Sequence, residues 1–301
     1  MANNPKLIPS RLNLDAALQV PPDSSGFILQ AEGRQHYWEG TGLLSIKSFS
    51  RGRALYNTGK GFYAVDENSY LILNDKQPYS ITIESERPVE SFCVFFKAGF
   101  AEQIYYSLWS EQEKLLDNPE PPDKPQIGFF DKTYAHDDVL SPALLSVKSS
   151  FAERKDQTDW LEEQMHELMQ MLLRVRRGTY QEALTLNPVR VSTREELYRR
   201  LVRAKDYISA CFDQPVTLKE IADVACLSPN HLLRSFRQAF RQTPHQFLTA
   251  KRLEHARKML ADSNLSVTDI CFSVGFESLG SFSRMFRRHT GFSPQEYRRK
   301  R

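Results

Sequence analysis

The chain carries one helical unit twice, first as Ile221-Ala-Asp-Val-Ala-Cys-Leu-Ser-Pro-Asn-His-Leu-Leu-Arg-Ser-Phe236-Arg and again as Ile270-Cys-Phe-Ser-Val-Gly-Phe-Glu-Ser-Leu-Gly-Ser-Phe-Ser-Arg-Met-Phe286-Arg. Each copy has two runs of apolar residues at helical spacing, separated by a turn, and so predicts a helix-turn-helix. Ile221 and Ile270 correspond at an offset of 49 residues, whereas Phe236 and Phe286 correspond at 50. The second turn therefore contains one additional residue.

Capping residues predict where the helices of this region begin. Thr217, Thr243 and Ser293 are each followed three residues later by Glu or Gln, the pattern of a capping box, and Ser266 begins a weaker version. Proline suits the first helical position, because its missing N–H has no intrahelical partner there. The predicted starts are near 218, 229, 244, 267, 279 and 294, and a further helix is predicted near 194–211.

The second helix of each copy has an apolar face and an outward face. The apolar face holds Phe236 in the first copy and Phe286 in the second, each with other apolar residues at helical spacing. An outward arginine suits the major groove of DNA, where its guanidinium can pair with guanine O6 and N7, and asparagine can pair with adenine. The candidate base-reading residues are Asn230, Leu233, Arg234, Arg237, Ser283, Arg284 and Arg287. An arginine-bearing face is more often only a solvated surface, but two matched copies favour DNA binding.

The spacing of the two copies also suits DNA. A helix predicted from Thr243 to about Leu260 would be roughly 25 Å long and, with its flanking turns, would hold the outward faces about one helical turn of DNA apart, roughly 34 Å. Residues 189–301 hold 21 Lys and Arg against 11 Asp and Glu, a net charge of +10, whereas residues 1–188 carry −7. Such a basic segment attracts phosphate. The candidates for contact with the DNA backbone are Arg241, Lys251, Arg252, Arg288 and the terminal run Arg298-Arg-Lys-Arg301.

Residues 197–298 resemble the DNA-binding domain of the AraC/XylS family of bacterial transcription regulators. The most specific matches are Gly275-Phe276, Phe282-x-Arg284-x-Phe286-Arg287, Gly291-x-Ser293-Pro294 and Tyr297-Arg298. Leu233 and Gly280 depart from a direct base-reading role, although Leu233 could contact a thymine methyl group. Gly275 stands where a helix ends, a place that favours positive φ. Cys226 is its equivalent in the first copy, and we expect it to be a small buried residue in a slightly different turn.

The preceding part of the chain has the pattern of a separate β domain. Short runs rich in β-branched and aromatic residues follow one another from Gly26 to Lys97, with Gly, Asn, Asp and Pro between them. The predicted fold is an α+β multidomain protein, with an N-terminal cupin-like β-barrel with helices and a C-terminal all-α domain with two helix-turn-helix units. The barrel follows from the short strands, and its cupin-like character is implied by the resemblance. The predicted ranges are an arm at 1–25, the barrel domain at 26–178, a linker at 179–192 and the DNA-binding domain at 193–301.

A heptad-like apolar stripe follows the barrel segments. It consists of Leu161, Met165, Leu168, Leu172 and Val175. Spacings of four and three residues are typical of a coiled-coil seam, so all but the last are candidate dimer contacts. The alternative is a helix packed on its own barrel, and the pattern alone does not separate the two.

Binding is the expected role of the barrel. Candidate effector-binding residues are His36, Trp38, Arg53, Tyr63 and Tyr79, which are polar or aromatic residues of the barrel segments. Neither a metal site nor a cofactor is predicted, because the His residues lack cupin ligand spacing and the four Cys residues form no C-x-x-C pair. No nucleophile motif or phosphate-binding glycine loop is present, so we expect no enzyme.

The expected function is sequence-specific DNA binding by a transcription regulator that responds to a small effector. An architectural or partner-recruiting DNA-binding protein without a ligand is the alternative. Double-stranded DNA is the predicted partner, and a homodimer, a small-molecule effector and RNA polymerase are further expected partners. With no apolar run of 18 residues, no signal peptide and unpaired cysteines, we expect no membrane contact and a cytoplasmic location.

Overall fold

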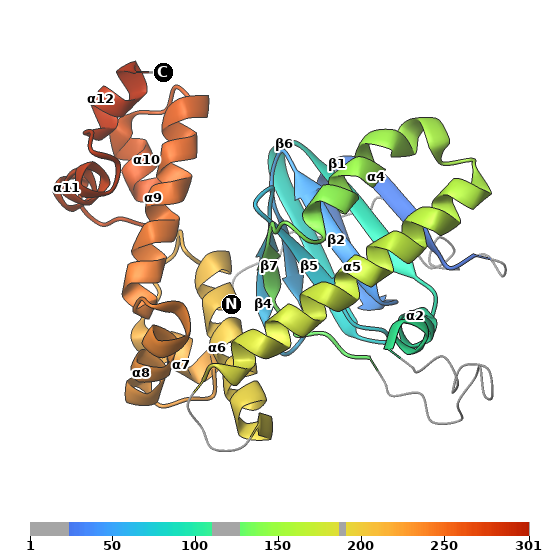
Figure 1. The fold of residues 1–301 in the computed structure, drawn as a ribbon. Helices are drawn as coiled ribbons and strands as arrows, with labels where there is room; N and C mark the ends of the chain where they lie inside the picture. The colour runs from blue at the N-terminus through green and yellow to red at the C-terminus, as the bar shows by residue number, and fades with distance from the viewer. Residues whose placement is uncertain (1–23, 110–126, 187–190, 301) are drawn as a thin grey trace. The chain divides into compact units, whose positions relative to one another are not determined.

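The computed structural model describes residues 24–109, 127–186 and 191–300. It divides the chain into two compact units, Met1–Thr185 and Leu186–Arg301 (Figure 1). We call them the barrel domain and the helical domain. Most of the predicted arm at 1–25 lies outside the described residues; Ser24 and Ser25 both donate hydrogen bonds to one carboxylate oxygen of Glu162.

The barrel domain is built on one antiparallel sheet. Its described strands are β1 (Gly26–Thr41), β2 (Ser45–Ser50), β3 (Ala54–Asn57), β4 (Phe62–Val65), β5 (Ser69–Leu73), β6 (Pro78–Phe96) and β7 (Thr133–Ala135). They follow the order β4-β3-β6-β2-β5-β7, and β1 pairs along the length of β6. The end strands β4 and β7 approach each other, so the sheet is nearly closed into a barrel.

Alternating side chains give the sheet two buried faces. In β2, Ile46 belongs to a core shared with helices, whereas Phe49 belongs to a second core inside the barrel. The same alternation in β5 sends Ile72 to the helical side and Leu71 and Leu73 to the interior. Because both faces are covered, β5 is almost continuously apolar, whereas β2 also carries Lys47 and three serines.

Three described helices belong to this domain, namely α2 (Phe100–Trp109), α4 (Ser141–Arg154) and α5 (Thr158–Leu184). The stripe on α5 packs on the domain's own core: Met165, Leu168 and Leu172 have no exposed surface, and Leu161 is partly buried against the same cluster. Met165, Leu168 and Leu172 therefore pack on the barrel, the alternative to a dimer contact, while a dimer contact of Leu161 stays a prediction. The spacing correctly indicated a buried stripe, but a heptad does not say which surface buries it.

The predicted linker at 179–192 also differs from the structure. Helix α5 continues to Leu184, and α6 (Val191–Ala210) begins before the predicted linker ends. Thr179 and Ala183 are buried on α5, so helical packing extends past Gly178 despite the low helix propensity of glycine. Residues 187–190 lie outside the described part of the chain.

The helical domain contains both predicted helix-turn-helix units. After α6 come α7 (Leu218–Val224), α8 (Pro229–Phe240), α9 (Pro244–Asp262), α10 (Val267–Ser273), α11 (Leu279–Thr290) and α12 (Pro294–Arg299). All the predicted starts are confirmed. Capping boxes are complete at Thr217, Thr243 and Ser293, and the Ser266 hydroxyl accepts from the Asp269 N–H as the weaker cap. Of the helices described, none has the length and apolar character needed to cross a membrane.

The turns of the two units share one geometry. The Leu227 N–H donates to the Ala222 carbonyl at 2.9 Å, and the Phe276 N–H donates to the Cys271 carbonyl at 3.1 Å. These are the 6→1 bonds of a Schellman motif, which needs a left-handed residue before the donor. Cys226 has φ 52° and Gly275 has φ 86°.

One expectation about Cys226 is wrong, because its side chain is exposed rather than buried. Its backbone is left-handed like that of Gly275, so the expected difference between the two turns lies in their length. The left-handed residue lies just beyond the end of the helix, where the chain turns away from the core. The additional residue of the second turn is confirmed, because three residues separate Ala225 from Pro229 and four separate Val274 from Leu279.

Candidate DNA interface and barrel cavity

Helix α8 has one face in the core and one in solvent. Leu232 and Phe236 have no exposed surface, whereas Asn230, Arg234 and Arg237 are exposed. Leu233 is half-buried beside them. Packing of the two apolar side chains fixes the rotation of the helix about its axis and so directs the arginines outward.

Helix α11 repeats this arrangement. Phe282 and Phe286 are completely buried, Arg284 and Arg287 are exposed, and Ser283 is half-buried. Gly280 is exposed, and a Cβ atom built there would meet nothing within 4 Å. The position equivalent to Asn230 therefore offers no side chain for base contact, as the sequence indicated.

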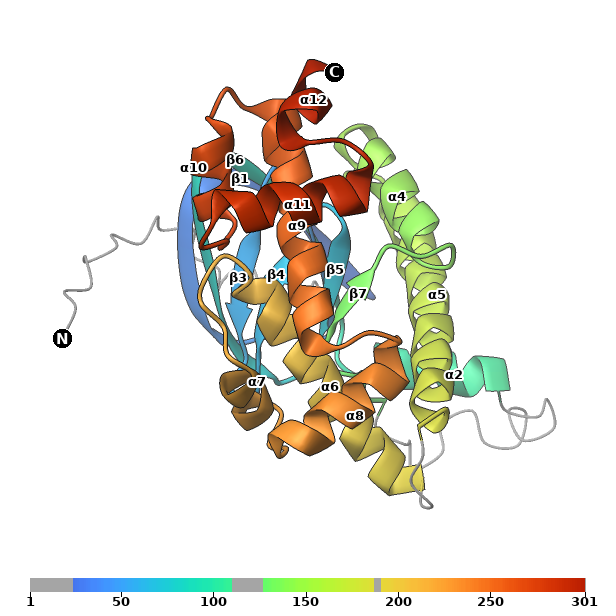
Figure 2. The ribbon, with the colours of Figure 1, turned by 90° about the vertical axis from the view of Figure 1, so that its left-hand side faces the viewer.

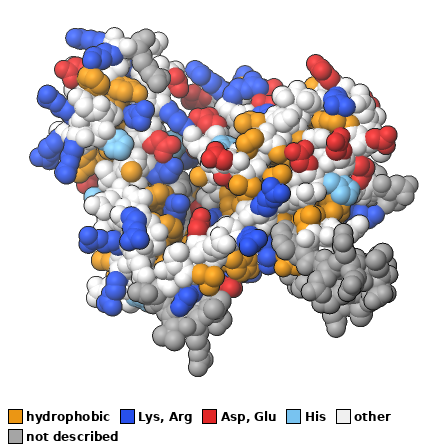
Figure 3. Space-filling model, viewed as in Figure 1, with side chains coloured by type: hydrophobic (Ala, Val, Ile, Leu, Met, Phe, Trp, Pro, Cys, Tyr) orange, Lys and Arg blue, Asp and Glu red, His pale blue; other side chains and the backbone are white. Residues whose placement is uncertain are grey.

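Helix α9 separates the two arginine-bearing helices. Figures 1 and 2 show α8 and α11 near opposite ends of α9 and on the same side of it. With Pro244–Asp262 as its bounds, α9 is about 28 Å long. Lys and Arg side chains are dense over the helical domain, at the left of Figure 3. The predicted outward arginines thus lie on two helices that one rigid element holds apart.

The four predicted backbone-contact residues divide into two pairs. Arg241 and Arg288 are exposed. Lys251 forms an ion pair with Glu254 at 3.0 Å. Arg252 donates from Nε to the Phe212 carbonyl at 2.7 Å and from a terminal nitrogen to the Gln214 carbonyl at 2.8 Å.

Arg252 thus holds the segment after α6 rather than presenting a free guanidinium, and burial lowers its pKa. Arg252 therefore has a structural role, and its contact with the DNA backbone stays a prediction. In the terminal run, Arg298 donates to the Leu265 carbonyl at 2.6 Å. Sequence reasoning missed both internal contacts, because each joins segments more than thirty residues apart.

A cavity of about 140 Å³ lies inside the barrel. Three of the predicted effector residues, His36, Trp38 and Tyr79, line it, and burial lowers the pKa of His36. Arg53 and Tyr63 do not line it; Tyr63 is buried, with its hydroxyl 3.5 Å from the Asp131 carbonyl oxygen. The other lining residues are mostly apolar or aromatic, among them Leu29, Phe49, Tyr56, Ile81, Ile83, Val89 and Phe95.

Lys47 is the lining residue that sequence reasoning missed. It has 2% of its surface exposed, and its ammonium lies 3.6 Å from the centre of the Phe95 ring and 5.5 Å from that of Tyr79. Burial lowers its pKa to about 8. A cation–π contact offsets about 2 kcal/mol of desolvation, less than the several kcal/mol that burying an ion costs. The alternation of Ser45, Lys47 and Phe49 along β2 is the sequence signal that could have placed this side chain inside.

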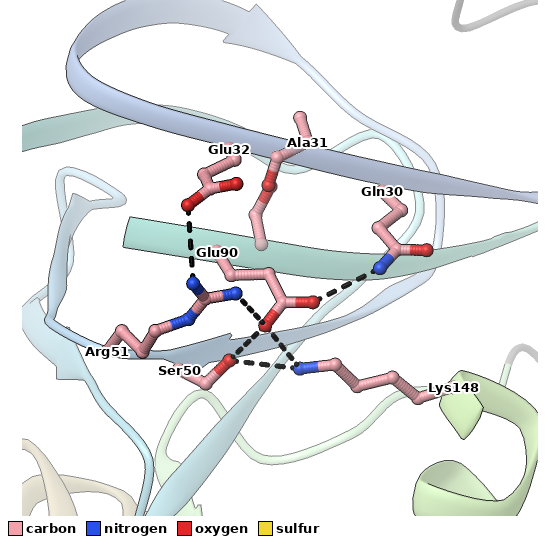
Figure 4. A network of polar contacts seen from close by, with 8 residues as sticks. Gln30, Ala31, Glu32, Ser50, Arg51, Glu90 and Lys148 are labelled. Carbon is pink, nitrogen blue, oxygen red and sulfur yellow. Dashed lines mark hydrogen bonds and ion pairs between the residues drawn. The ribbon is translucent and has the colours of Figure 1, made fainter. Parts of the chain in front are cut away.

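A polar network joins the sheet to α4 beside the cavity (Figure 4). Glu90 on β6 accepts hydrogen bonds from Ser50 at 2.7 Å and Gln30 at 3.1 Å, and Lys148 on α4 lies 3.2 Å from it. The Ser50 hydroxyl, followed by Lys148, lowers the pKa of Glu90 to about 2, although burial acts in the opposite direction. This network ties β1, β2 and β6 to α4.

Arg51 joins the network to the cavity rim. Its guanidinium lies 3.3 Å from Glu90 and 3.4 Å from Glu32, which lines the cavity. Glu32, the acidic residue among those lining the cavity, is therefore already paired. Across the described residues, no three His, Cys, Asp or Glu side chains are grouped to hold a metal ion.

Comparison with known proteins identifies relatives of the helical domain. Residues 221–300 match a family model described as a helix-turn-helix domain. The melibiose operon regulatory protein of Escherichia coli (strain K12) is 33% identical over 93 residues, which are 31% of each chain. The HTH-type transcriptional activator RhaS of Enterobacter sp. (strain 638) is 33% identical over 133 residues, 44% of each chain.

Among solved structures, a probable AraC family transcriptional regulator from Rhodopseudomonas palustris CGA009 is 27% identical to this chain. The match covers 34% of this chain and 95% of that protein, with a TM-score of 0.32. The matched region spans less than half the length of these two curated relatives. It coincides with the duplicated helix-turn-helix and its two arginine faces. The helical domain of this chain therefore contains an AraC-type helix-turn-helix domain.

Proposed function

We propose that this chain regulates transcription by binding a bipartite site on double-stranded DNA, with α8 and α11 in two successive major-groove segments. The observation that carries the proposal is the matched pair of exposed arginines, Arg234 and Arg284, on helices whose opposite faces bury Phe236 and Phe286 completely. A surface that only faces solvent does not require arginines at equivalent positions of the two helices. A surface that reads two major-groove segments requires them, because each helix must present the same face to DNA.

The two helices have different roles in this proposal. Asn230, Leu233, Arg234 and Arg237 form a four-residue reading face on α8, in which Asn230 suits adenine and Leu233 suits a thymine methyl group. On α11 the face is reduced to Ser283, Arg284 and Arg287. The first half of the site therefore carries more of the base discrimination. Arg241 and Arg288 contact phosphates beside the two halves.

The barrel domain binds a small effector in its cavity and thereby shifts the occupancy of the DNA site. Three converging polar or aromatic residues, His36, Trp38 and Tyr79, line an otherwise apolar space, the composition of a small-molecule site. Such coupling requires that the effector binds the two functional states with different affinities. A homodimer and a contact with RNA polymerase stay predictions, and a dimer would use a surface other than the buried stripe of α5.

Selection from random DNA duplexes tests the regulatory proposal directly. The full chain should enrich two half-elements about one helical turn apart, roughly 34 Å between centres. Uniform recovery of all sequences would instead identify an architectural DNA-binding protein.

Single substitutions assign the half-elements. Arg234→Ala and Arg284→Ala should each cost about 1–3 kcal/mol at one base step, in different half-elements. Arg87→Ala, which removes an exposed arginine from the barrel domain, is the matched control and should leave the selected site unchanged. An equal loss on every sequence would mean that Arg234 or Arg284 contacts phosphate rather than bases.

A further inference from the structure

Lys47 introduces a positive charge into the barrel cavity. Its neighbours across the sheet are Leu71 on β5 and Cys93 on β6, and neither is an anion: burial raises the pKa of the Cys93 thiol. The contacts of its ammonium among the described residues are the Phe95 and Tyr79 rings, and no carboxylate pairs with it there. A buried ammonium without an anion is an incomplete site, because buried charges in proteins are paired.

The remaining charged and titratable groups do not supply that anion. Glu32 at the rim is paired with Arg51 at 3.4 Å. Burial raises the pKa of Tyr56 and of Tyr79, so both hydroxyls stay protonated at neutral pH. Burial also lowers the pKa of His36, which leaves its imidazole neutral under the same conditions. The cavity therefore holds one positive charge and no second cation.

The size and the lining of the cavity restrict the ligand further. About 140 Å³ is available, close to the roughly 150 Å³ of an engineered apolar cavity that binds benzene. Trp38 and Tyr79 lie with their ring centres 4.8 Å apart and form an aromatic wall. One cation matches a ligand with one negative charge, whereas a phosphate dianion would bring a second charge into an apolar space.

We propose that the barrel cavity binds a small monocarboxylate, whose carboxylate pairs with the Lys47 ammonium and whose apolar body of about benzene size packs against Trp38 and Tyr79. This ligand class rests on the effector-binding role proposed above. It names the chemistry of the effector and the residue that selects it. Lys47 on β2 is the specificity-determining residue of the site.

Calorimetry on the full chain tests the proposal with four probes, phenylacetate and hexanoate and their neutral amides. At pH 7 at least one carboxylate should bind with a Kd below about 1 mM and about tenfold more tightly than its amide. Lys47→Met, which keeps the length of the side chain and removes its charge, should abolish that preference. Lys60→Met is the matched control, because Lys60 is an exposed lysine of the same domain.

Proton uptake on ligand binding tests the proposal in the unsubstituted protein. Lys47 titrates near pH 8 in the empty site, and pairing with a carboxylate raises its pKa. Binding at pH 8 should therefore take up about half a proton, whereas binding at pH 6.5 should take up almost none. Measurements in two buffers with different ionisation enthalpies give this number. The neutral amides should show no uptake at either pH.

Three outcomes would overturn the inference: no carboxylate binds, the amides bind equally well, or Lys47→Met keeps the preference. Circular dichroism verifies that the variant is folded; removing an unpaired buried charge should not destabilise it. DNA selection with the same protein tests the proposed DNA reading independently of carboxylate binding. Selection of a bipartite site without carboxylate binding rejects the ligand class alone, whereas carboxylate binding without selection rejects the DNA-reading role alone.

Discussion

Cys226→Gly and Gly275→Ala, at equivalent positions of the two helix-turn-helix turns, should change the stability of the helical domain in opposite directions. Cys226 and Gly275 both adopt left-handed backbone geometry, which costs a residue with a Cβ atom about 1–2 kcal/mol. Cys226→Gly removes that strain, but glycine also gives the unfolded chain about 0.4–1 kcal/mol of additional freedom. The net result should be a stabilisation of about 0.5–1 kcal/mol. The exposed Cys226 side chain adds no packing loss.

Gly275→Ala should be much more costly. The new Cβ atom would lie 2.9 Å from the Phe212 carbonyl oxygen and 3.0 Å from the Arg252 guanidinium. It would strain the backbone and displace Arg252 from its two carbonyl acceptors, and hydrogen bonds to a charged donor are worth about 1.5–3 kcal/mol. The expected destabilisation of the helical domain is about 2–4 kcal/mol.

Hydrogen exchange as a function of urea measures both effects in the full chain, because the slowest amides of α9 report the unfolding free energy of the helical domain separately from that of the barrel. Gly33→Ala is a control, since a Cβ atom there would meet nothing within 4 Å. Unchanged protection in Gly275→Ala, or weaker protection in Cys226→Gly, would refute the strain reasoning.

Three other substitutions give independent checks. Arg241 also has a left-handed backbone, with φ 58°, so Arg241→Gly should stabilise the helical domain by about 0.5–1 kcal/mol. The same substitution should weaken DNA binding and reduce the slope of its salt dependence by about 1. Tighter DNA binding would exclude a phosphate contact of Arg241. Glu90 stabilises the barrel domain above its unfolded pKa of 4.5, and this contribution disappears as pH falls towards about 2. In urea titrations Glu90→Gln should therefore lose about 1 kcal/mol at pH 7, after solvent screening, and flatten the pH dependence below 4.5; an unchanged pH profile would contradict the role of the network. Leu168→Ala should lose about 2–5 kcal/mol from the barrel domain without changing the molar mass measured by light scattering, whereas dissociation of an oligomer would restore the predicted dimer contact.

The helical domain could be predicted closely because its signals are local. A capping box needs only a hydroxyl and a carboxylate or amide three residues apart, and the packing face of α8 follows from the period of one helix. Because the helix-turn-helix unit is duplicated, these local signals occur in both copies. Cys226 was the exception, because its exposure depends on how the chain leaves α7 rather than on its own polarity.

The barrel cavity could be predicted only in part. His36, Trp38 and Tyr79 were found from their residue types, but Lys47 was not, because a lysine in a strand is usually solvated. Its burial depends on the pairing of β2 with both β5 and β6, which joins residues far apart in the chain. Long-range pairing also decided that the α5 stripe packs on its own domain.

The length of α9 restricts which insertions and deletions this chain can tolerate. One residue added to an α-helix rotates everything beyond it by about 100° and moves it by about 1.5 Å. A single insertion between Pro244 and Asp262 would therefore turn Arg284 away from the side that Arg234 faces, while every side chain stayed intact. An insertion of about seven or eleven residues would restore the direction but would lengthen the separation by roughly 10–16 Å. In functional descendants of this sequence, the exposed positions of α9 should vary more readily than its length.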